Sequence, residues 1–365
     1  MDITFIITDQ QKAHEGIVRP FLNFAKALQS KYQLSFLLLN CSKQFSKNIQ
    51  KNSFHVIVCQ NKNSAIEELK LLNPRFIFTD DDLKRLKLAS EIKKKINTKT
   101  ISYIQILYGS HSIADCFDRN SLTLKEKIRF APLRYVPFSF FSNRYAKFLR
   151  TFDLVIANSK VTATFLHSLY NVEVSGIVYP PVDTDIFQPS SPKSKKEIIL
   201  YLGSHLGDSS EVFVKKLVAC IVETGFIVNI FGNPKMAIKL ASNGNKSVLF
   251  HSNMADSELA QIYSRSKLTV CPQKWEQFGM VPVESLSCGT PVLAFNCMGF
   301  QETIPKTVGW LANNESEFLE MLHTALESVE LPRQNLRDTA TEEFSISVSG
   351  RALEALLEKY INPKT

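Results

Sequence analysis

Residues 267–295 read KLTVCPQKWEQFGMVPVESLSCGTPVLAF and contain a complete strand–helix–strand unit. The mainly apolar runs at 267–271 and 291–295 are typical of strands buried on both faces. Between them we predict a helix that begins near Met280, because Pro282 is tolerated in a first helical turn, and that ends at Cys288–Gly289. Two buried strands joined by a helix predict parallel neighbours with a right-handed crossover.

The same alternation of strand and helix extends along the chain in both directions. We predict further strands in the second half at 197–203, 226–232, 247–251 and 307–311. Strands of the first half are predicted at 3–8, 34–39, 54–59, 76–79, 100–107 and 153–157. Helical spacing of apolar residues marks 17–30, 64–72, 83–97, 159–169, 209–224, 256–264, 315–328 and 343–360. This pattern predicts an α/β protein with two doubly wound, Rossmann-like domains that face each other across a cleft.

Residues 179–197 separate the two halves and read YPPVDTDIFQPSSPKSKKE, with four prolines. Proline fixes φ and removes a backbone donor, so we expect an extended linker here. Because ligands of open α/β sheets bind beyond the carboxyl ends of the strands, two such domains offer one half-site for each of two reactants. That arrangement suits a transferase, and it also suits a hinged solute-binding protein.

The formal net charge is +8, and most of it lies in one segment. Residues 125–150 hold seven Lys/Arg, one Glu and seven aromatic residues. Such a composition is typical of an element at a membrane surface, where cations meet anionic head groups and rings enter the interface. The alternative is that the rings pack in the core and the cations form a solvated face. Because the rest of the chain is nearly neutral, we predict no nucleic-acid partner.

Length and composition exclude several other classes of protein. The chain has 365 residues, 44% of them hydrophobic and 21% charged, which suggests two globular domains and excludes a fibre. No stretch approaches the ~18 apolar residues of a membrane-spanning helix. The seven cysteines form no C-x-x-C pair, so we expect neither a disulfide framework nor a zinc site. The start, MDITFIITDQ, lacks the basic region of a signal peptide, so we expect a cytoplasmic protein and not an exported binding protein.

The chemistry is concentrated between Trp275 and Ala294. Gly279 would allow the backbone to approach a ligand closely, and the free N–H groups around Met280 and Val281 would form an anion cradle at the helix start. Glu276 precedes this helix and Glu284 lies in its first turns. A carboxylate can accept hydrogen bonds from two vicinal hydroxyls, as on a ribose or a hexose.

This segment resembles the E-x-F-G-x4-E…G-x-P-V signature of family 4 retaining glycosyltransferases, which use nucleotide sugars and have the GT-B fold. The matching residues are Glu276, Phe278, Gly279, Glu284, Gly289, Pro291 and Val292. Further segments resemble the same family in register: ANS at 157–159, YPPVD at 179–183, DSEL at 256–259 and GFQETI at 299–304, the last with one glycine missing. The resemblance covers most of residues 150–330, whereas the first 150 residues match in architecture.

The resemblance implies a role for each matching residue. By this resemblance, Glu276 would contact the donor sugar's hydroxyls and Glu284 would contact the nucleotide's ribose. The backbone of Phe278, Gly279, Met280 and Val281 would contact the sugar and the diphosphate. Gly16, within HEGIV at 14–18, resembles a weakened form of the family's glycine-rich first loop. No metal or other cofactor is implied, because protein donors hold the diphosphate.

The resemblance also implies how the chain divides. Residues 1–178 together with 343–365 would form the acceptor-binding domain, the last helix crossing back to it. Residues 179–196 would be the linker, and residues 197–342 the nucleotide-sugar-binding domain.

Two positions depart from the family pattern. The family carries an arginine and a lysine for the diphosphate after the first strand of its second domain, but residues 203–209 read GSHLGDS. Ser204 and His205 are the polar candidates there, and we expect weaker stabilisation of the leaving group. The family's histidine after the strand at 100–107 is replaced by Gln105, which makes His111 the candidate near the reacting sugar.

We therefore predict a retaining glycosyltransferase that moves a sugar from a nucleotide-diphosphate donor to a lipid-linked or cell-surface glycan. It would be peripheral on the cytoplasmic face of a membrane, held there through residues 125–150. The alternatives are a non-catalytic relative that binds sugar nucleotides and another GT-B enzyme, either an epimerase or a phosphorylase. Asp80, Asp81 and Asp82 resemble a metal-binding triplet, but their place between a strand and a helix favours helix capping.

Overall fold

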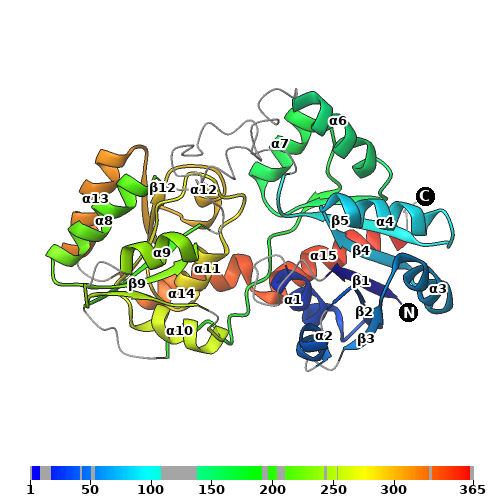
Figure 1. Ribbon diagram of the computed structural model, residues 1–365, viewed down its shortest axis with the longest axis horizontal. Coiled ribbons are helices and arrows are strands. Elements are labelled where there is room, and N and C mark those ends of the chain that lie inside the picture. Colours follow the sequence, from blue (N-terminus) through cyan, green and yellow to red (C-terminus); the bar gives the residue numbers. More distant parts are fainter. Residues whose placement is uncertain are drawn as a thin grey trace. The chain divides into compact units, whose positions relative to one another are not determined.

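The chain forms two compact α/β units, which we describe separately (Figure 1). The computed structural model describes residues 2–8, 18–41, 43–50, 54–107, 138–190, 196–203, 210–241, 245–252, 254–328 and 331–361. Among these, the first unit takes in 2–107, 138–181 and 346–361, and the second takes in 182–345. Both sheets are parallel, which confirms the predicted fold class.

The first unit is built on a seven-stranded sheet with strand order β3-β2-β1-β4-β5-β6-β7. Its strands are β1 Ile3–Thr8, β2 Leu34–Leu39, β3 His55–Cys59, β4 Phe76–Asp80, β5 Lys99–Ile104, β6 Leu154–Ala157 and β7 Gly176–Ile177. One face carries α1 Arg19–Leu28, α2 Lys43–Gln50 and α15 Ile346–Ile361. The other face carries α3 Lys62–Leu72, α4 Leu83–Lys93, α6 Phe138–Leu149 and α7 Lys160–Tyr170. The strand order reverses between β1 and β4, which is where such sheets bind ligands.

The second unit is built on a six-stranded sheet with strand order β10-β9-β8-β11-β12-β13. Its strands are β8 Glu197–Leu202, β9 Ile227–Gly232, β10 Val248–Phe250, β11 Leu268–Cys271, β12 Val292–Phe295 and β13 Gly309–Ala312. Its helices are α8 Glu211–Glu223, α9 Pro234–Ala241, α10 Asp256–Arg265, α11 Met280–Ser287, α12 Phe300–Thr303, α13 Glu315–Glu327 and α14 Arg333–Phe344. Here the order reverses between β8 and β11. The strand–helix–strand unit predicted from residues 267–295 is β11, α11 and β12.

The last helical stretch, predicted over 343–360 with a return to the first domain, is confirmed as α15 Ile346–Ile361 of the first unit, whereas α14 of the second unit was not predicted. Helix α14 ends at Phe344, and Ser345 has extended backbone with φ −65° and ψ 158° before α15 begins. Helix α15 packs on α1 so closely that a Cβ on Gly350 would lie 2.4 Å from the Cβ of Ala27. That contact belongs to the first unit.

The segment expected as a linker is packed over much of its described length. Phe187 is 1% exposed and meets the Tyr263 ring edge-on at 6.2 Å. The Ser287 hydroxyl donates to the Phe187 carbonyl, and the Arg337 guanidinium donates to the carbonyls of Phe187 and Thr184. Residues 182–190 therefore belong to the second unit, where the sequence suggested a spacer.

Three predicted absences can be compared with the described residues. No described helix is both long and apolar enough to span a bilayer. Within the described ranges, no group of three His, Cys, Asp or Glu side chains is arranged to hold a metal ion. The six cysteines that the structure describes are free thiols.

Candidate functional site

The bend before α11 depends on a glycine. Gly279 is the N-cap of α11 and has φ +99° and ψ 71°, a left-handed conformation that side-chain-bearing residues rarely adopt. A Cβ at this position would lie 3.2 Å from Thr303 Oγ1 and 3.3 Å from the Phe300 ring. Gly279 therefore provides the bend and packs closely on the segment that includes Thr303 and Phe300, while the close approach of a ligand remains a prediction.

The loop before α11 is held by the segment that includes α12. The Gly299 N–H donates to the Glu276 carbonyl at 2.9 Å, and a Cβ on Gly299 would lie 2.5 Å from Phe278 Cα. The Thr303 hydroxyl donates to the Phe278 carbonyl at 3.4 Å. Although one glycine of the family pattern is missing at 299–304, Gly299 occupies the place where the two backbones touch.

Glu276 lies half-buried in this loop, at the carboxyl edge of the second sheet. Burial raises the pKa of its carboxyl to about 7, although the backbone N–H groups of Phe278, Gly279 and Gln277 and the Gln273 amide act to lower it. A carboxyl with this pKa is about half ionised at neutral pH. It can accept hydrogen bonds from hydroxyls and can take up a proton.

Glu284 lies deeper, in the second turn of α11, and is 2% exposed. Its Oε2 accepts a hydrogen bond of 3.4 Å from the Tyr263 hydroxyl of α10. Burial, followed by the charge on Glu284, holds the pKa of Tyr263 well above its usual value. A ribose would have to reach a carboxylate that is enclosed by α10 and α11.

The side chains of the other motif residues are buried or half-buried, so we expect a ligand to meet their main chain. Phe278 is 2% exposed, and its ring meets Phe344 of α14 edge-on at 5.5 Å. Met280 and Val281 are half-buried at the start of α11. This arrangement agrees with a role for the main chain of residues 278–281, which remains a prediction.

Several predicted site residues lie outside the described residues. They are Gly16, His111, Ser204 and His205, together with residues 125–137 of the basic aromatic segment. Gln105, at the position of the family's histidine, is described and is 8% exposed.

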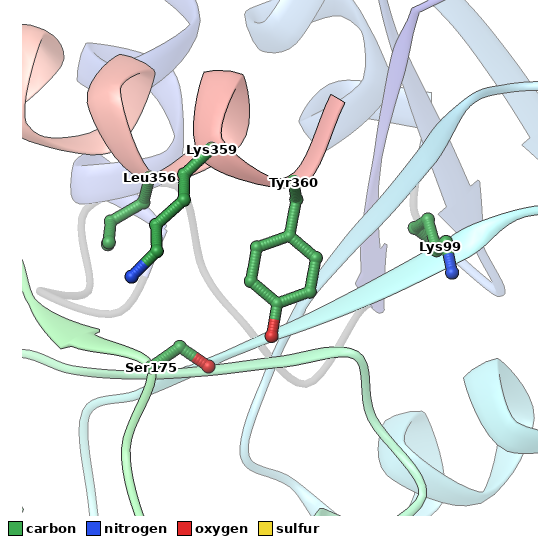
Figure 2. A pocket seen from close by; sticks show the side chains of 5 residues that line it. All are labelled: Lys99, Ser175, Leu356, Lys359 and Tyr360. Atoms are coloured by element: carbon green, nitrogen blue, oxygen red, sulfur yellow. The ribbon is translucent and has the colours of Figure 1, made fainter. Parts of the chain in front are cut away.

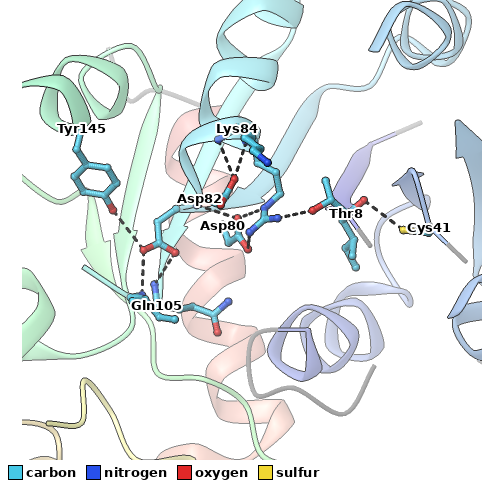
Figure 3. A network of polar contacts seen from close by, with 11 residues as sticks. Thr8, Cys41, Asp80, Asp82, Lys84, Gln105 and Tyr145 are labelled. Carbon is cyan, nitrogen blue, oxygen red and sulfur yellow. Dashed lines mark hydrogen bonds and ion pairs between the residues drawn. The ribbon is translucent and has the colours of Figure 1, made fainter. Parts of the chain in front are cut away.

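The carboxyl edge of the first sheet holds a buried polar network (Figure 3). Arg85 of α4 forms a two-pronged ion pair with Asp80 at the end of β4, and its Nη1 donates to the Thr8 hydroxyl at the end of β1 at 2.6 Å. Asp82 is the N-cap of α4 and accepts from the N–H groups of Lys84 and Arg85. The capping role is therefore confirmed for Asp82, whereas Asp80 binds a guanidinium.

Asp81 takes a third role, which the sequence did not reveal. It is 7% exposed and accepts from the Ile106 N–H at 3.0 Å and from the Tyr145 hydroxyl at 3.4 Å. Burial, followed by the neighbouring charge of Asp80, raises the pKa of Asp81 to about 8. Asp81 thereby fixes the loop that leaves β5 at the carboxyl edge of the first sheet.

A separate pocket of about 460 Å³ lies at the opposite, amino edge of the first sheet (Figure 2). Lys99 at the start of β5, Ser175 before β7, and Leu356, Lys359 and Tyr360 of α15 line it. Its position separates it from the carboxyl edge that carries the polar network.

Comparisons with known proteins agree with this geometry. Residues 182–342 match the family model described as "Glycosyl transferases group 1". The chain is 30% identical over 186 residues to the lipopolysaccharide core biosynthesis mannosyltransferase LpsB of Rhizobium meliloti, covering 44% of this chain and 50% of that protein. It is 24% identical over 230 residues to the D-inositol 3-phosphate glycosyltransferase of Mycolicibacterium smegmatis, covering 57% and 52%. These matches span about half the length of the curated relatives.

Solved structures share the fold over nearly the whole chain. A glycosyltransferase of Rickettsia africae superposes with a TM-score of 0.73 at 16% identity, covering 99% of both chains. Anabaena Alr3699/HepE in complex with UDP and glucose gives a TM-score of 0.74 at 16% identity, covering 98% of this chain and 99% of that one. Residues 182–342 are therefore similar to the group 1 glycosyl transferases, in a chain that has the GT-B fold.

Proposed function

We propose that this protein is a retaining glycosyltransferase that moves a sugar from a nucleotide-diphosphate donor to an acceptor hydroxyl. The observation that carries the proposal is the left-handed glycine bend at Gly279, with Glu276 before it and Glu284 after it, at the carboxyl edge of the sheet in the matched domain. Similar proteins include a mannosyltransferase and a D-inositol 3-phosphate glycosyltransferase, and one structure of this fold holds UDP and glucose.

In this proposal the second unit binds the donor. The ionised Glu276 carboxylate accepts from the sugar's hydroxyls, and Glu284 accepts from the ribose once the Tyr263 contact opens. Amides at the start of α11 stabilise the charge that develops on the diphosphate as the glycosidic bond breaks. The acceptor hydroxyl, bound by the first unit, attacks from the same face and passes its proton to the departing phosphate oxygen, so that the new glycosidic bond forms with the anomeric configuration retained.

Two substitutions test this site. Glu276→Gln keeps the size of the side chain but removes the charge, and Glu284→Ala removes the ribose acceptor. We expect each to lower transfer by about 100-fold or more while the circular dichroism spectrum stays that of the wild type. Transfer should persist in the presence of EDTA, since we propose no metal or cofactor. Near-normal turnover in both variants would remove this site from consideration.

A second candidate function is binding of a sugar nucleotide without transfer. The observation in its favour is the sequence 203–209, GSHLGDS, which lacks the arginine and lysine expected to hold the leaving diphosphate. A thermal-shift screen of nucleotide sugars, followed by an assay for released nucleoside diphosphate, separates the two. Stabilisation together with release supports the transferase, whereas stabilisation alone supports the binding protein. An epimerase would give an altered sugar still attached to its nucleotide.

We further propose that the acceptor is a lipid-linked glycan and that the first unit meets an anionic membrane surface on the cytoplasmic face. Helix α6, the described part of the basic aromatic segment, has Arg144 and Lys147 exposed, and Phe140 is 62% exposed. Helix α4 packs on the same face of the sheet and carries a row of exposed lysines, at 84, 87 and just beyond its end at 94. Cations on both helices would contact anionic head groups.

Co-sedimentation with vesicles that contain anionic lipid tests the membrane contact. Alanine at 127, 129, 134 and 144 should reduce pelleting, and so should Lys84→Ala, Lys87→Ala and Lys94→Ala combined. The matched control changes three exposed lysines of the second unit, Lys216, Lys246 and Lys306. We expect about 1 kcal/mol of membrane affinity per cation that faces the surface. Equal pelleting of all proteins, or none by the wild type, would rule the contact out.

A further inference from the structure

Gln273 occupies a position where ligands of parallel sheets bind. It is the second residue after β11, at the carboxyl end of that strand, and β11 is one of the two strands between which the order reverses. Three residues further along the same loop lies Glu276, whose pKa the Gln273 amide lowers. The two side chains are therefore neighbours at the mouth of the sheet.

The side chain of Gln273 is buried with its oxygen unpaired. It is 1% exposed, its amide nitrogen faces the Glu276 carboxyl, and its oxygen has no hydrogen-bond partner among the residues that the structure describes. A buried amide oxygen that has lost water and gained no partner destabilises the folded chain. Such a group calls for a reason beyond packing, because a leucine of similar size would fill the same space at no such cost.

The chemistry of the amide identifies what would satisfy it. Its nitrogen donates and already faces the Glu276 carboxyl, whereas its oxygen accepts and needs a donor. A diphosphate only accepts, and it would leave the oxygen unpaired. A sugar hydroxyl donates and accepts, and a neighbouring hydroxyl on the same ring can donate to Glu276.

We propose that Gln273 is a specificity-determining residue whose amide oxygen accepts a hydrogen bond from a hydroxyl of the donor's sugar, beside Glu276. The proposal rests on the proposed function, because it assumes a nucleotide-sugar donor. Since the amide is enclosed, the loop that carries Glu276 shifts to admit the sugar. The donor's sugar thereby pairs an oxygen that none of the described residues pairs, and sugars without a hydroxyl at that position bind less tightly.

Gln273→Leu separates this role from a structural one. The free variant should be more stable than the wild type, with a melting temperature about 2–4 °C higher, because the unpaired amide oxygen is gone. Its affinity for a nucleotide sugar should fall 10-fold or more, while its affinity for the matching nucleoside diphosphate stays within 2-fold. The probes are UDP-glucose, UDP-galactose and GDP-mannose, each compared with UDP or GDP by calorimetry.

Thr79→Val is the matched control. The Thr79 hydroxyl in β4 of the first unit is also fully buried without a partner among the described residues. Its removal should raise the melting temperature as well, but should leave both affinities unchanged. If the wild type binds no nucleotide sugar, the proposed function fails. If it binds one and Gln273→Leu binds it equally well, or loses sugar nucleotide and bare nucleotide alike, the proposed function stands and the role of Gln273 is overturned.

Discussion

At the scale of single residues, alanine substitutions at two glycines with positive φ distinguish the cost of an unfavourable backbone conformation from the cost of a steric clash. Gly279 has φ +99° and has Thr303 and Phe300 within contact distance of an added Cβ, whereas Gly225 has φ +82° with open space around it. We predict that Gly225→Ala lowers the free energy of unfolding by about 1 kcal/mol and leaves donor binding intact. Gly279→Ala should cost more and should abolish donor binding. Equal effects in urea unfolding and in donor titrations would contradict this.

The identity of the site residues could be predicted from the sequence, but their chemical state could not. The order Glu276, Phe278, Gly279, Glu284 identified the loop and the start of α11 because strand, bend and helix are local features. The raised pKa of Glu276 and the enclosure of Glu284 by Tyr263 depend on groups brought together by folding. Gln273 gave no signal at all, since a glutamine in a loop is ordinarily solvated.

At the scale of elements, the Arg85–Asp80 ion pair ties the start of α4 to β4 and, through Thr8, to β1. Arg85 is 5% exposed and Asp80 is 1% exposed. We predict that Arg85→Met lowers the free energy of unfolding by about 3–5 kcal/mol, because it leaves a buried carboxylate unpaired. The double variant Arg85→Met with Asp80→Leu should regain most of that loss. Additive losses in the double variant, measured by urea unfolding, would contradict this account.

Helix α4 shows which part of an element the sequence predicts. The apolar spacing of residues 83–97 correctly predicted a helix, and the Asp82 cap marks its start. Arg85, however, sits in a stretch crowded with lysines and resembles another solvated cation. Its burial follows from Asp80 at the end of β4 and Thr8 at the end of β1, two positions that the sequence does not connect to it.

At the scale of the whole chain, two parallel sheets were predictable because buried strands and intervening helices repeat along the sequence. The division of the chain was harder to predict. The proline-rich stretch after 179 suggested a spacer, yet Phe187 is buried against Tyr263 in the second unit. The periodicity of 343–360 correctly predicted α15 and its place in the first unit, whereas α14, which precedes it in the second unit, was not predicted. The burial of Phe187 depends on a packing partner far away in the sequence.

The same long-range burial makes the stability of the chain depend on pH. The pKa of Asp81 in the first unit is raised to about 8, and the pKa of Glu276 in the second is raised to about 7. In the unfolded chain both carboxyls ionise near pH 4, so the folded state binds more protons than the unfolded state between pH 4 and pH 7–8. The stabilisation is therefore complete below about pH 4 and is lost as the pH rises through this window.

We predict that the free energy of unfolding declines as the pH rises from 5 to 8, by up to about 1 kcal/mol per pH unit for each carboxyl. The Asp81→Asn variant has no carboxyl that can ionise at this position. The free energy of unfolding of the first unit should therefore decline less steeply with pH. Glu276→Gln should do the same in the second unit and leave the first unchanged. Asp185→Asn, which removes an exposed carboxyl, serves as the control and should keep the wild-type slope. Urea unfolding at pH 5, 6, 7 and 8 measures these slopes. A stability that rises across this range, or an Asp81→Asn slope equal to that of the wild type, would show that Asp81 is ionised in the folded protein.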